Sequence, residues 1–439
     1  MSLLEKASMI NINNKKMKKS IHNPKRTDIF LIIVLLILIS SPFIVNLFNK
    51  ADVENKQISL YISPRFEELF GTELTEALLQ EYRLQNPELL IQVSDAADGN
   101  GSSPDIFLFD EGDYGDLVTG SLLQLNTFIE HEADSAVNIT EQYAIPLVSF
   151  MDLFFYNIDV LTAAGFDRPP KTRDEFLAYA KAVSGNNSEL LENTTGTAIS
   201  LSSRDRQAVS RDIFSWMWAT GGDFWPEGDG HALQGKPVLD MRNMANDISF
   251  LRSLYNERVL AYGTFDSTGE QRLEEFADGR IAMMIASSKA IPFLRERMGD
   301  DAFGITNIPD TGTAGNYNIS LSGIYAGINI NCEHRDIAWS FLVFLAEKAE
   351  FFCDVFKAVP GGFSNMIPGN YARDDPFYSK AWGIYETSQI VQGFSKKPGA
   401  AAYEGVFLEE LQIFFLSNRT AQETLTAIQQ RWDEIDNER

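Results

Sequence analysis

Residues 144–183 read AIPLVSFMDLFFYNIDVLTAAGFDRPPKTRDEFLAYAKAV, and this stretch is the most informative about the fold. Its apolar run LFFYN, residues 153–157, is typical of a buried strand. A proline pair follows, and then Thr172 and Glu175 have the spacing of a capping box. A helix is therefore expected over DEFLAYAKAV, residues 174–183. A strand followed by a capped helix is the repeating unit of α/β proteins.

The same alternation continues on both sides of this stretch. Apolar positions recur at helical spacing from Phe66 to Tyr82, and this helix is expected to end before an Asn-Pro pair. Thr420 and Glu423 form a second capping box, which begins the last helix. Strands alternating with helices predict α/β lobes with parallel sheets. Three further segments have the pattern of strands: residues 57–62, 89–93 and 105–109.

The chain after residue 50 is long enough for two lobes, because its 389 residues exceed one typical core. It contains no internal repeat, and no linker separates two halves. These features favour two lobes built from interleaved segments over two consecutive domains.

An apolar run, residues 29–48, follows a basic stretch near the N-terminus. Twenty residues at helical rise span about 30 Å, the thickness of the hydrocarbon core of a bilayer. The preceding positive charge predicts residues 1–28 as a cytoplasmic tail and places the rest of the chain outside the cytoplasm. We expect a retained transmembrane anchor, with cleavage as a signal peptide as the alternative.

The exported part of the chain is strongly acidic. Of 37 basic and 61 acidic residues, 8 and 2 fall in the first 50, which leaves 29 basic against 59 acidic. This balance argues against nucleic acid or anionic lipid as a partner. The only two cysteines, Cys332 and Cys353, lie in this part. They either form a disulfide, as an oxidising compartment allows, or remain two buried thiols.

Familiar catalytic patterns are missing from the sequence, which contains no HExxH, GxSxG, Walker or dinucleotide-binding motif. The four histidines are too far apart for paired metal ligands, so no cofactor and no metal are predicted. The segment Asp110 to Asp113 is the best candidate for carboxylate chemistry, because it follows a strand end where α/β sheets bind ligands. An ordinary exposed acidic loop is the alternative.

The order of motifs resembles the family 1 extracellular solute-binding proteins, the sugar-capturing subunits of ABC importers. The resemblance runs from about residue 57 to 435 and is most specific in the stretch quoted first, with its YNxDxL and PPKTxxEF patterns. Further matching segments are PDIFLFDEGDYGDLVTGSLLQL (104–125), FSWMWATGGDFW (214–225), FADGRIAMMIAS (276–287), GITNIPDTG (304–312), SGIYAGINI (322–330) and IAWSFLVFLAE (337–347).

This resemblance implies a two-lobed periplasmic-binding-protein fold, with interleaved α/β lobes, hinge crossings and a ligand cleft. Residues 49–148 and 325–370 are expected to form lobe 1, and residues 149–324 and 371–439 lobe 2. It further implies a non-enzymatic protein outside the cytoplasm, with a carbohydrate as ligand and ABC permease subunits as partners. Closure of the lobes on the ligand is the implied mechanism.

The positions that correspond to ligand contacts in the family come from strand ends and loops on both lobes. Trp216 and Trp218 are two apart on a helix, so only one of them is expected to face the cleft. The expected site consists of Ser63, Arg65, Phe109, Asp110, Glu111, Asp113, Ser149, Phe150, Trp216, Trp218, Trp225, Ser287, Ser288, Lys289, Ser322, Gly323, Tyr325, Tyr403 and Glu404.

Two departures from the family pattern bear on function. Ser-Ser-Lys at 287–289 replaces a frequent Trp, which argues against a large oligosaccharide, and an anchor replaces the usual lipid-modified Cys or short signal. An anchored ligand sensor would use the same cleft. A lumenal glycosyltransferase-type enzyme is the alternative from another class, with Asp110 to Asp113 as its metal-holding motif.

Overall fold

The computed structural model describes residues 56–94, 103–132, 142–185, 191–205, 207–225, 235–311, 317–360, 370–391 and 393–438. The chain divides into two compact units, one of residues 1–56 and 67–90 and one of residues 57–66 and 91–439. The predicted tail and anchor, residues 1–48, lie outside the described residues. Among the helices that are described, none has the length and apolar character needed to cross a membrane.

Helix α3 (Pro64–Gln85) makes up most of the described part of the smaller unit. It covers the predicted run from Phe66 to Tyr82 and ends just before Asn86, as expected. Gly71 interrupts it with φ 73°, a left-handed conformation that glycine adopts without strain.

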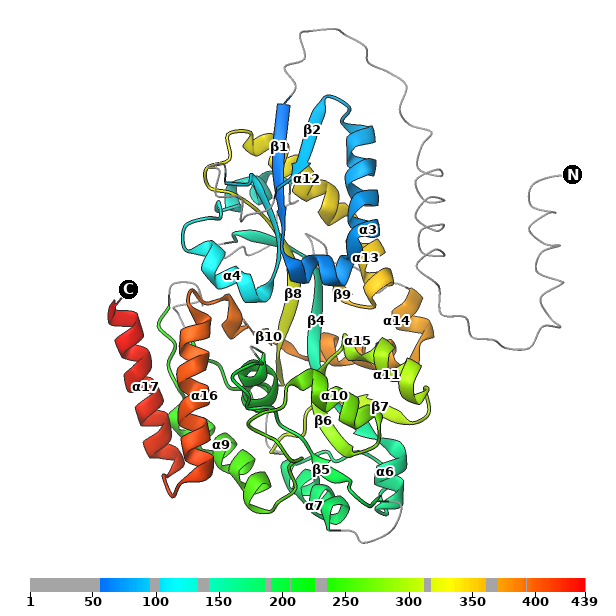
Figure 1. The fold of residues 1–439 in the computed structure, drawn as a ribbon, viewed down its shortest axis with the longest axis vertical. Coiled ribbons are helices and arrows are strands. Elements are labelled where there is room, and N and C mark those ends of the chain that lie inside the picture. The colour runs from blue at the N-terminus through cyan, green and yellow to red at the C-terminus, as the bar shows by residue number, and fades with distance from the viewer. Residues whose placement is uncertain are drawn as a thin grey trace, which may run out of the picture. The chain divides into compact units, whose positions relative to one another are not determined.

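One sheet organises the larger unit, with strand order β2-β1-β3-β8-β4-β6-β5 (Figure 1). β7 and β9 also pair with β4, and β10 pairs with β8. The strands are β1 (Lys56–Ile62), β2 (Leu89–Val93), β3 (Ile106–Asp110), β4 (Ala144–Asn157), β5 (Thr195–Thr197), β6 (Ile281–Ser287), β7 (Phe303–Thr306), β8 (Asn318–Ile328), β9 (Val359–Pro360) and β10 (Gln389–Val391).

The prediction of parallel sheets is only partly right, because the sheet is mixed. β1–β3, β5–β6 and β8–β10 are parallel pairs, whereas β3–β8, β4–β8 and β4–β6 are antiparallel. The antiparallel pairs arise from β4 and β8, the two longest strands, which run side by side (Figure 1). β4 pairs with β8 over Ala144–Met151 and with β6 from Asp152 onward. The predicted lobe boundaries at 148/149 and 324/325 fall within these two strands, and the lobe division stays a prediction.

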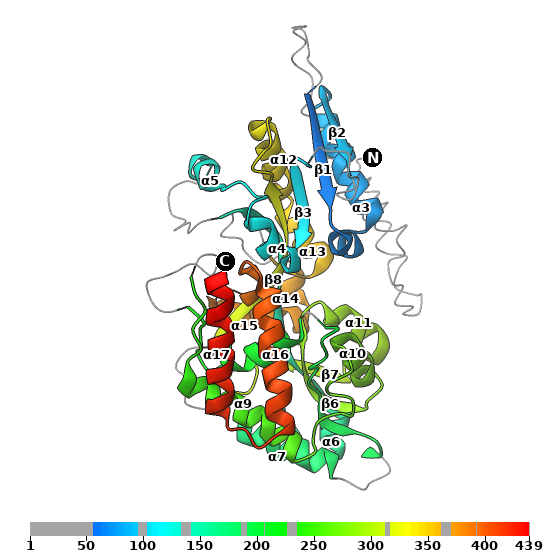
Figure 2. The same ribbon diagram turned by 60° about the vertical axis from the view of Figure 1, so that its left-hand side comes forward.

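Helices follow the strands and bury apolar faces around the sheet. α16 and α17 lie side by side in both ribbon views (Figures 1 and 2) and pack together in one large core cluster with α7 and α9. The helices after α3, these four included, are α4 (Glu111–Val118), α5 (Asn126–Glu132), α6 (Ile158–Ala163), α7 (Arg173–Ser184), η4 (Ser210–Phe214), α8 (Ser215–Trp218), α9 (Met241–Asn256), α10 (Gly269–Ala277), α11 (Ala290–Met298), α12 (Arg335–Glu347), α13 (Ala349–Phe356), α14 (Asn370–Asp374), α15 (Pro376–Thr387), η5 (Phe394–Lys396), α16 (Ala400–Leu416) and α17 (Ala421–Glu438).

Both predicted helix starts are present, with one difference in detail. Thr420 and Glu423 form the full reciprocal box at the start of α17. At α7 the Thr172 hydroxyl accepts from the backbone N–H of Glu175, as predicted. The Glu175 carboxylate, however, accepts from the N–H of Lys171 and binds Arg168 instead of returning to Thr172.

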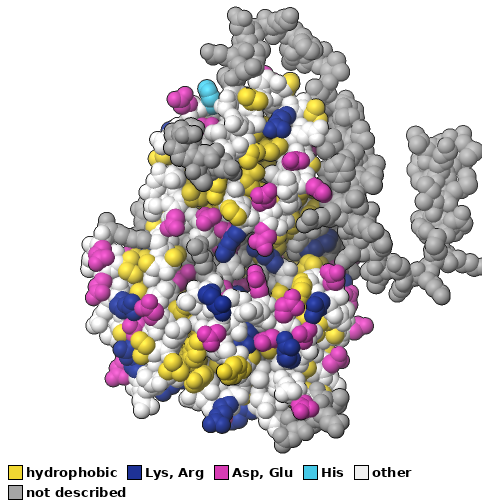
Figure 3. Space-filling model, in the orientation of Figure 1, with side chains coloured by type: hydrophobic (Ala, Val, Ile, Leu, Met, Phe, Trp, Pro, Cys, Tyr) yellow, Lys and Arg dark blue, Asp and Glu magenta, His cyan; other side chains and the backbone are white. Residues whose placement is uncertain are grey.

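The two cysteines, both within the described residues, are buried and do not form a disulfide. Of the two alternatives left by the sequence, the structure therefore has two buried thiols. On the face drawn in Figure 3, acidic and basic side chains are interspersed. The prediction that nucleic acid is not a partner stays a prediction.

Candidate functional site

A cleft of about 460 Å³ lies within the larger unit. Its wall comes from the junction of β3 and α4, the middle of β4 and β8, the end of β6, the segment before η4, and α16. Strand ends thus bring together segments that are far apart in the sequence, as is usual for ligand sites of α/β proteins. The expected site residues that line the cleft are Arg65, Glu111, Trp218, Ser287, Lys289, Ser322 and Glu404.

Glu111 connects three segments at the cleft. It is the first residue of α4, and only 5% of its surface is exposed. Its carboxylate accepts a hydrogen bond from Nε2 of Gln207 at 2.9 Å and another from the backbone N–H of Gly323 in β8. The N-terminus of a helix also favours a negative charge at this position. These contacts hold the side chain in one orientation at the cleft wall.

Asp110 is buried beside Glu111 but does not itself line the cleft. Its Oδ2 pairs with Nη1 of Arg65 at 3.0 Å, and its Oδ1 is buried without a hydrogen-bond partner. Asp113, later on α4, does not line the cleft either. The alternative of an ordinary exposed loop is therefore wrong for Asp110 and Glu111, which are 5% exposed each and end a strand and begin a helix.

A buried arginine network forms another part of the wall, and sequence reasoning missed it. Nη2 of Arg211 lies 2.8 Å from a carboxylate oxygen of Asp205 and 2.8 Å from one of Asp212. Asp205 also accepts from the N–H of Gly269 at 2.7 Å, which ties the segment to α10. No motif marks these residues, because charged side chains in a sequence are expected to be solvated until their burial is known.

Asp152 and Lys289 face the cleft from β4 and from the turn after β6. Asp152 accepts one long hydrogen bond, 3.4 Å from Oγ of Ser215. Nζ of Lys289 lies 4.7 Å from the ring centroid of Phe150, a cation–π contact. Among the described residues, no carboxylate lies within ion-pair distance of Lys289. Within the described residues, Lys289 is thus the cation of the cleft that forms no ion pair.

Glu404 reaches the cleft from α16. Its carboxylate accepts a hydrogen bond from Oγ of Ser210 at 2.8 Å. Ser210 and Gln207 lie on one turn, which the hydrogen bond from the N–H of Arg211 to the carbonyl of Gln207 closes. Glu111 and Glu404 are therefore held by neighbouring donors of the same turn.

Burial raises the pKa of three carboxyl groups at the cleft. The pKa of Glu111 rises to about 7, with Lys289 opposing and Asp110 adding to the effect of burial. The pKa of Asp152 rises to about 6 because burial outweighs the opposing charge of Arg211. The pKa of Glu404 rises to about 7 through burial, which the Ser210 hydrogen bond opposes and Glu111 reinforces. These groups take up protons near neutral pH.

We expect the Glu404→Gln protein to be more stable than the wild type at pH 8 and to lose most of this difference by pH 5. Between the ordinary pKa of 4.5 and the folded-state pKa of about 7, the folded wild type binds more protons than the unfolded chain. The free energy of unfolding of the wild type therefore falls as pH rises through this interval. The full shift corresponds to at most about 3 kcal/mol, since part of Glu404 faces solvent.

Thermal unfolding of both proteins without ligand, from pH 5 to pH 8, measures this difference. Glu386→Gln is the matched control, because it removes the same charge from an exposed position on α15. Parallel stability curves for Glu404→Gln and the wild type would contradict a raised pKa of Glu404 in the folded protein.

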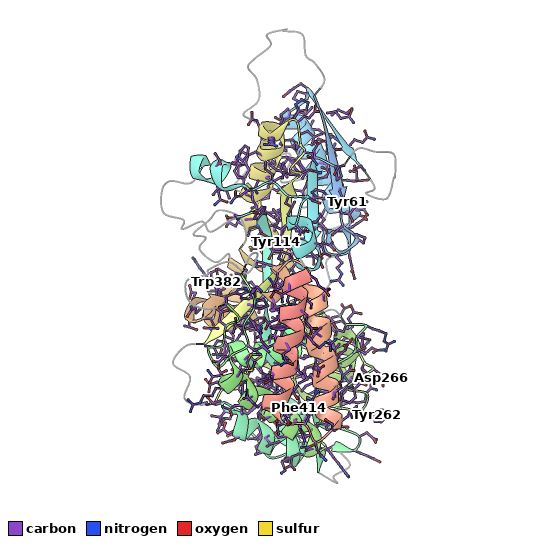
Figure 4. The ribbon with its side chains drawn as sticks, turned by 90° about the vertical axis from the view of Figure 1, so that its left-hand side faces the viewer. Tyr61, Tyr114, Tyr262, Asp266, Trp382 and Phe414 are labelled. Atoms are coloured by element: carbon purple, nitrogen blue, oxygen red, sulfur yellow. The ribbon has the colours of Figure 1, made fainter. Side chains whose placement is uncertain are left out.

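Several expected aromatic contacts are packed into the core instead. Phe109 is 0% exposed and stacks on Tyr325, and both rings contact Tyr114, labelled on α4 in Figure 4. Tyr403 is also fully buried, and its hydroxyl donates to Asp436 at 2.6 Å. Phe150 is 1% exposed and meets Lys289 with its ring face. These residues do not line the cleft, and we remove them from the proposed contact set.

The tryptophans divide as the helical spacing predicts. Trp218 lines the cleft, whereas Trp216 packs against Phe176 and Phe250 in the core. Trp225 is buried against Phe394 and is not part of the cleft wall. The Nε1 atom of Trp218 is buried without a hydrogen-bond partner.

Most of the serine and glycine residues expected at the site form hydrogen bonds through or to the backbone instead. Oγ of Ser63 accepts from the N–H of Phe66 and so caps α3, and Oγ of Ser288 accepts from the N–H of Met151. Ser149 is buried in β4. Gly323 acts through its backbone N–H on Glu111. These four residues do not line the cleft either. Residues that sequence reasoning missed but that line it include Asp152, Asp205, Gln207, Ser210, Arg211, Phe394 and Gln412.

Solved structures similar to this chain share its fold. Maltose-bound MalE3 of T. maritima is 17% identical, with a TM-score of 0.64 over 86% of this chain and 99% of that chain. A cyclic alpha-maltosyl-1,6-maltose binding protein from Arthrobacter globiformis is 16% identical, with a TM-score of 0.68 over 86% and 98%. UgpB from Mycobacterium tuberculosis in complex with glycerophosphocholine is 18% identical, with a TM-score of 0.66 over 87% and 98%.

A family model supports the same relationship at the level of sequence. The model described as "Bacterial extracellular solute-binding protein" matches residues 89–380, more than half of the chain. The expectation of a two-lobed periplasmic-binding-protein fold is confirmed by these similarities and by the mixed sheet with its two long crossing strands. The chain belongs to the bacterial extracellular solute-binding proteins.

Proposed function

We propose that the protein captures a carbohydrate in the cleft and delivers it to the permease of an ABC importer. The observation that carries this proposal is a cleft of about 460 Å³ in a solute-binding fold, walled by buried polar side chains from many segments. Volumes of this size are typical of small-molecule sites. Two of the similar structures are sugar-binding proteins by their titles, which supports a sugar here.

The chemistry of the wall suits a sugar. Carboxylate and amide groups such as Glu111 and Gln412 accept from and donate to hydroxyl groups. Trp218 and Phe394 supply aromatic surface for the C–H faces of a sugar ring. The wall thus combines apolar surface with a few oriented polar groups.

Closure of the two proposed lobes is supported by contacts between them. Gln207, from proposed lobe 2, donates to Glu111 of proposed lobe 1. Nζ of Lys396 lies 5.1 Å from the ring centroid of Tyr325 and 5.7 Å from that of Tyr114. A ligand that contacts both lobes would favour this arrangement over an open one.

We expect the cognate sugar to raise the temperature of unfolding. A ligand that binds only the folded state stabilises it by RT ln(1 + [L]/Kd), about 2.7 kcal/mol at a hundredfold excess over Kd. Thermal unfolding of the protein with a panel of mono- and oligosaccharides measures the effect, and an unrelated polyol of equal osmolarity is the control. No shift with any sugar would count against the proposed function.

The family places the protein outside the cytoplasm, and we propose residues 29–48 as its membrane anchor. The full-length protein is expected in the membrane fraction after an alkaline carbonate wash, because an apolar run of 20 residues is long enough to span a bilayer. A shortened form released into the soluble fraction of cells would show instead that the run is a cleaved signal.

The alternatives from the sequence are less well supported. A glycosyltransferase-type enzyme is not favoured, since the family and the similar structures are solute-binding proteins. An anchored sensor shares the cleft with an importer subunit, and no contact in the described residues favours it.

A further inference from the structure

The charges that line the cleft do not balance. Six carboxyl side chains line it, against the three cations Arg65, Arg211 and Lys289. Two of the six are paired, Asp205 with Arg211 and Glu409 with Arg431. Arg65 is committed to Asp110, and Arg211 to Asp205 and Asp212. Lys289 is therefore the one cation among the described lining residues that has no ion-pair partner. Its positive charge lowers the pKa values of both Glu111 and Asp152, against the effect of burial. Burying carboxylates without a matching cation is costly.

Two of these carboxyl groups, those of Glu111 and Glu404, accept hydrogen bonds from side chains on one turn of the backbone. Gln207 presents its Nε2 to Glu111, and Ser210 presents its hydroxyl to Glu404. Residues three apart on one helical turn have Cβ atoms about 5–6 Å apart, so the two acids approach neighbouring donors from β3–α4 and from α16. The negative charge of Glu111 also raises the pKa of Glu404, after the larger effect of burial. Among the described residues, no cation lies within ion-pair distance of Glu404.

A second feature of the wall points to a ligand independently of the acids. Trp218 lines the cleft, is 2% exposed, and its indole N–H has no acceptor. Gly112 lines the cleft too, and Oδ1 of Asp110 lies 3.3 Å from the position that a Cβ of Gly112 would occupy. This oxygen is also buried without a donor. One indole N–H of a lining residue and, beside the acids, one carboxylate oxygen are therefore buried without hydrogen-bond partners.

From this charge balance and geometry we propose that the cleft selects a sugar that carries an ammonium group, which lies between Glu111 and Glu404. The inference rests on the proposed function and names its ligand class. The ammonium group would supply the missing cation and donate to both carboxylates, and such charge-assisted hydrogen bonds are the stronger kind. The sugar hydroxyls are then available to accept from Trp218. A neutral sugar leaves the two acids to share a proton instead.

Matched pairs of sugars test this inference on the full-length protein in detergent. The pairs are glucosamine with N-acetylglucosamine, and the glucosamine disaccharide with its diacetylated form, with glucose and maltose as further neutral probes. Calorimetry at pH 7.5 is expected to show at least tenfold tighter binding of the free amine in one pair. The preference should shrink at pH 5, because both acids are then protonated below their folded-state pKa of about 7.

Variants distinguish binding of the amine at a specific site from general attraction to an acidic surface. Glu404→Gln keeps the shape of the side chain and is expected to remove the preference for the amine over its neutral partner. Glu386→Gln, with the same charge change on exposed α15, should leave the preference intact. Tighter binding of the neutral partner, or an unchanged preference in Glu404→Gln, overturns the inference and leaves the proposed function standing. No binding of any probe contradicts the proposed function and the inference with it.

Discussion

Replacement of Glu111 by Ala is expected to weaken ligand binding about 100-fold or more. The carboxylate lines the cleft and accepts from Gln207 and Gly323, so it holds β8 and the segment before η4 against α4. Each hydrogen bond to a charged group contributes roughly 1.5–3 kcal/mol, and the change leaves both donors unsatisfied. Every 1.4 kcal/mol is a factor of ten in affinity. Calorimetry with whichever sugar binds the wild type measures the loss.

Asp113→Ala is the matched control for this change. It removes an acid from the same helix, but from a position that does not line the cleft. Its affinity should stay within about twofold of the wild type. Equal losses in both variants would mean that the charge of α4 matters and the position of Glu111 does not.

A side chain at Gly115 is expected to weaken binding at least about tenfold, although Gly115 is not part of the cleft wall. A Cβ at this position would lie 2.2 Å from the carbonyl oxygen of Lys397, far inside contact distance. Gly115→Val therefore has to separate α4 from Lys397, which directly follows η5. Lys396, the last residue of η5, lies over Tyr114 and Tyr325. These contacts join the two proposed lobes, so the closed form should lose population.

Affinity and the radius of gyration with ligand, from small-angle scattering, measure the effect of Gly115→Val. Gly120→Ala, just after the same helix, is the control, because a Cβ there meets nothing within 4 Å. A wild-type affinity and radius in Gly115→Val would contradict the role of this contact in closure.

The fold was largely predictable because its signals are local. The capped start of α7 and the strands β1 to β3 follow from the spacing of apolar and capping residues. The mixed direction of the sheet was not predictable from such signals, because apolar strand patterns carry no direction. It depends on how β4 and β8 pair after long connections.

Residues of the site could be predicted only where their position along a helix or strand determines which side chains face the cleft. Ser287 and Lys289 line the cleft while Ser288 between them binds the backbone, an alternation that a list of polar residues cannot show. Aromatic residues such as Phe109 and Tyr403 have the right type for a sugar platform but are buried in the core. The network around Arg211 has no local signal, since its members come from a loop, from η4 and from α10.

Calorimetric titration of the protein with a carbohydrate panel, including the amine and neutral pairs, tests the central claim most directly. The account predicts that at least one sugar binds with one site per chain. It also predicts that Glu111→Ala abolishes or strongly weakens this binding while Asp113→Ala does not. Absence of binding across the panel, or a bound sugar whose affinity is unaffected by Glu111→Ala, would contradict a carbohydrate site in this cleft.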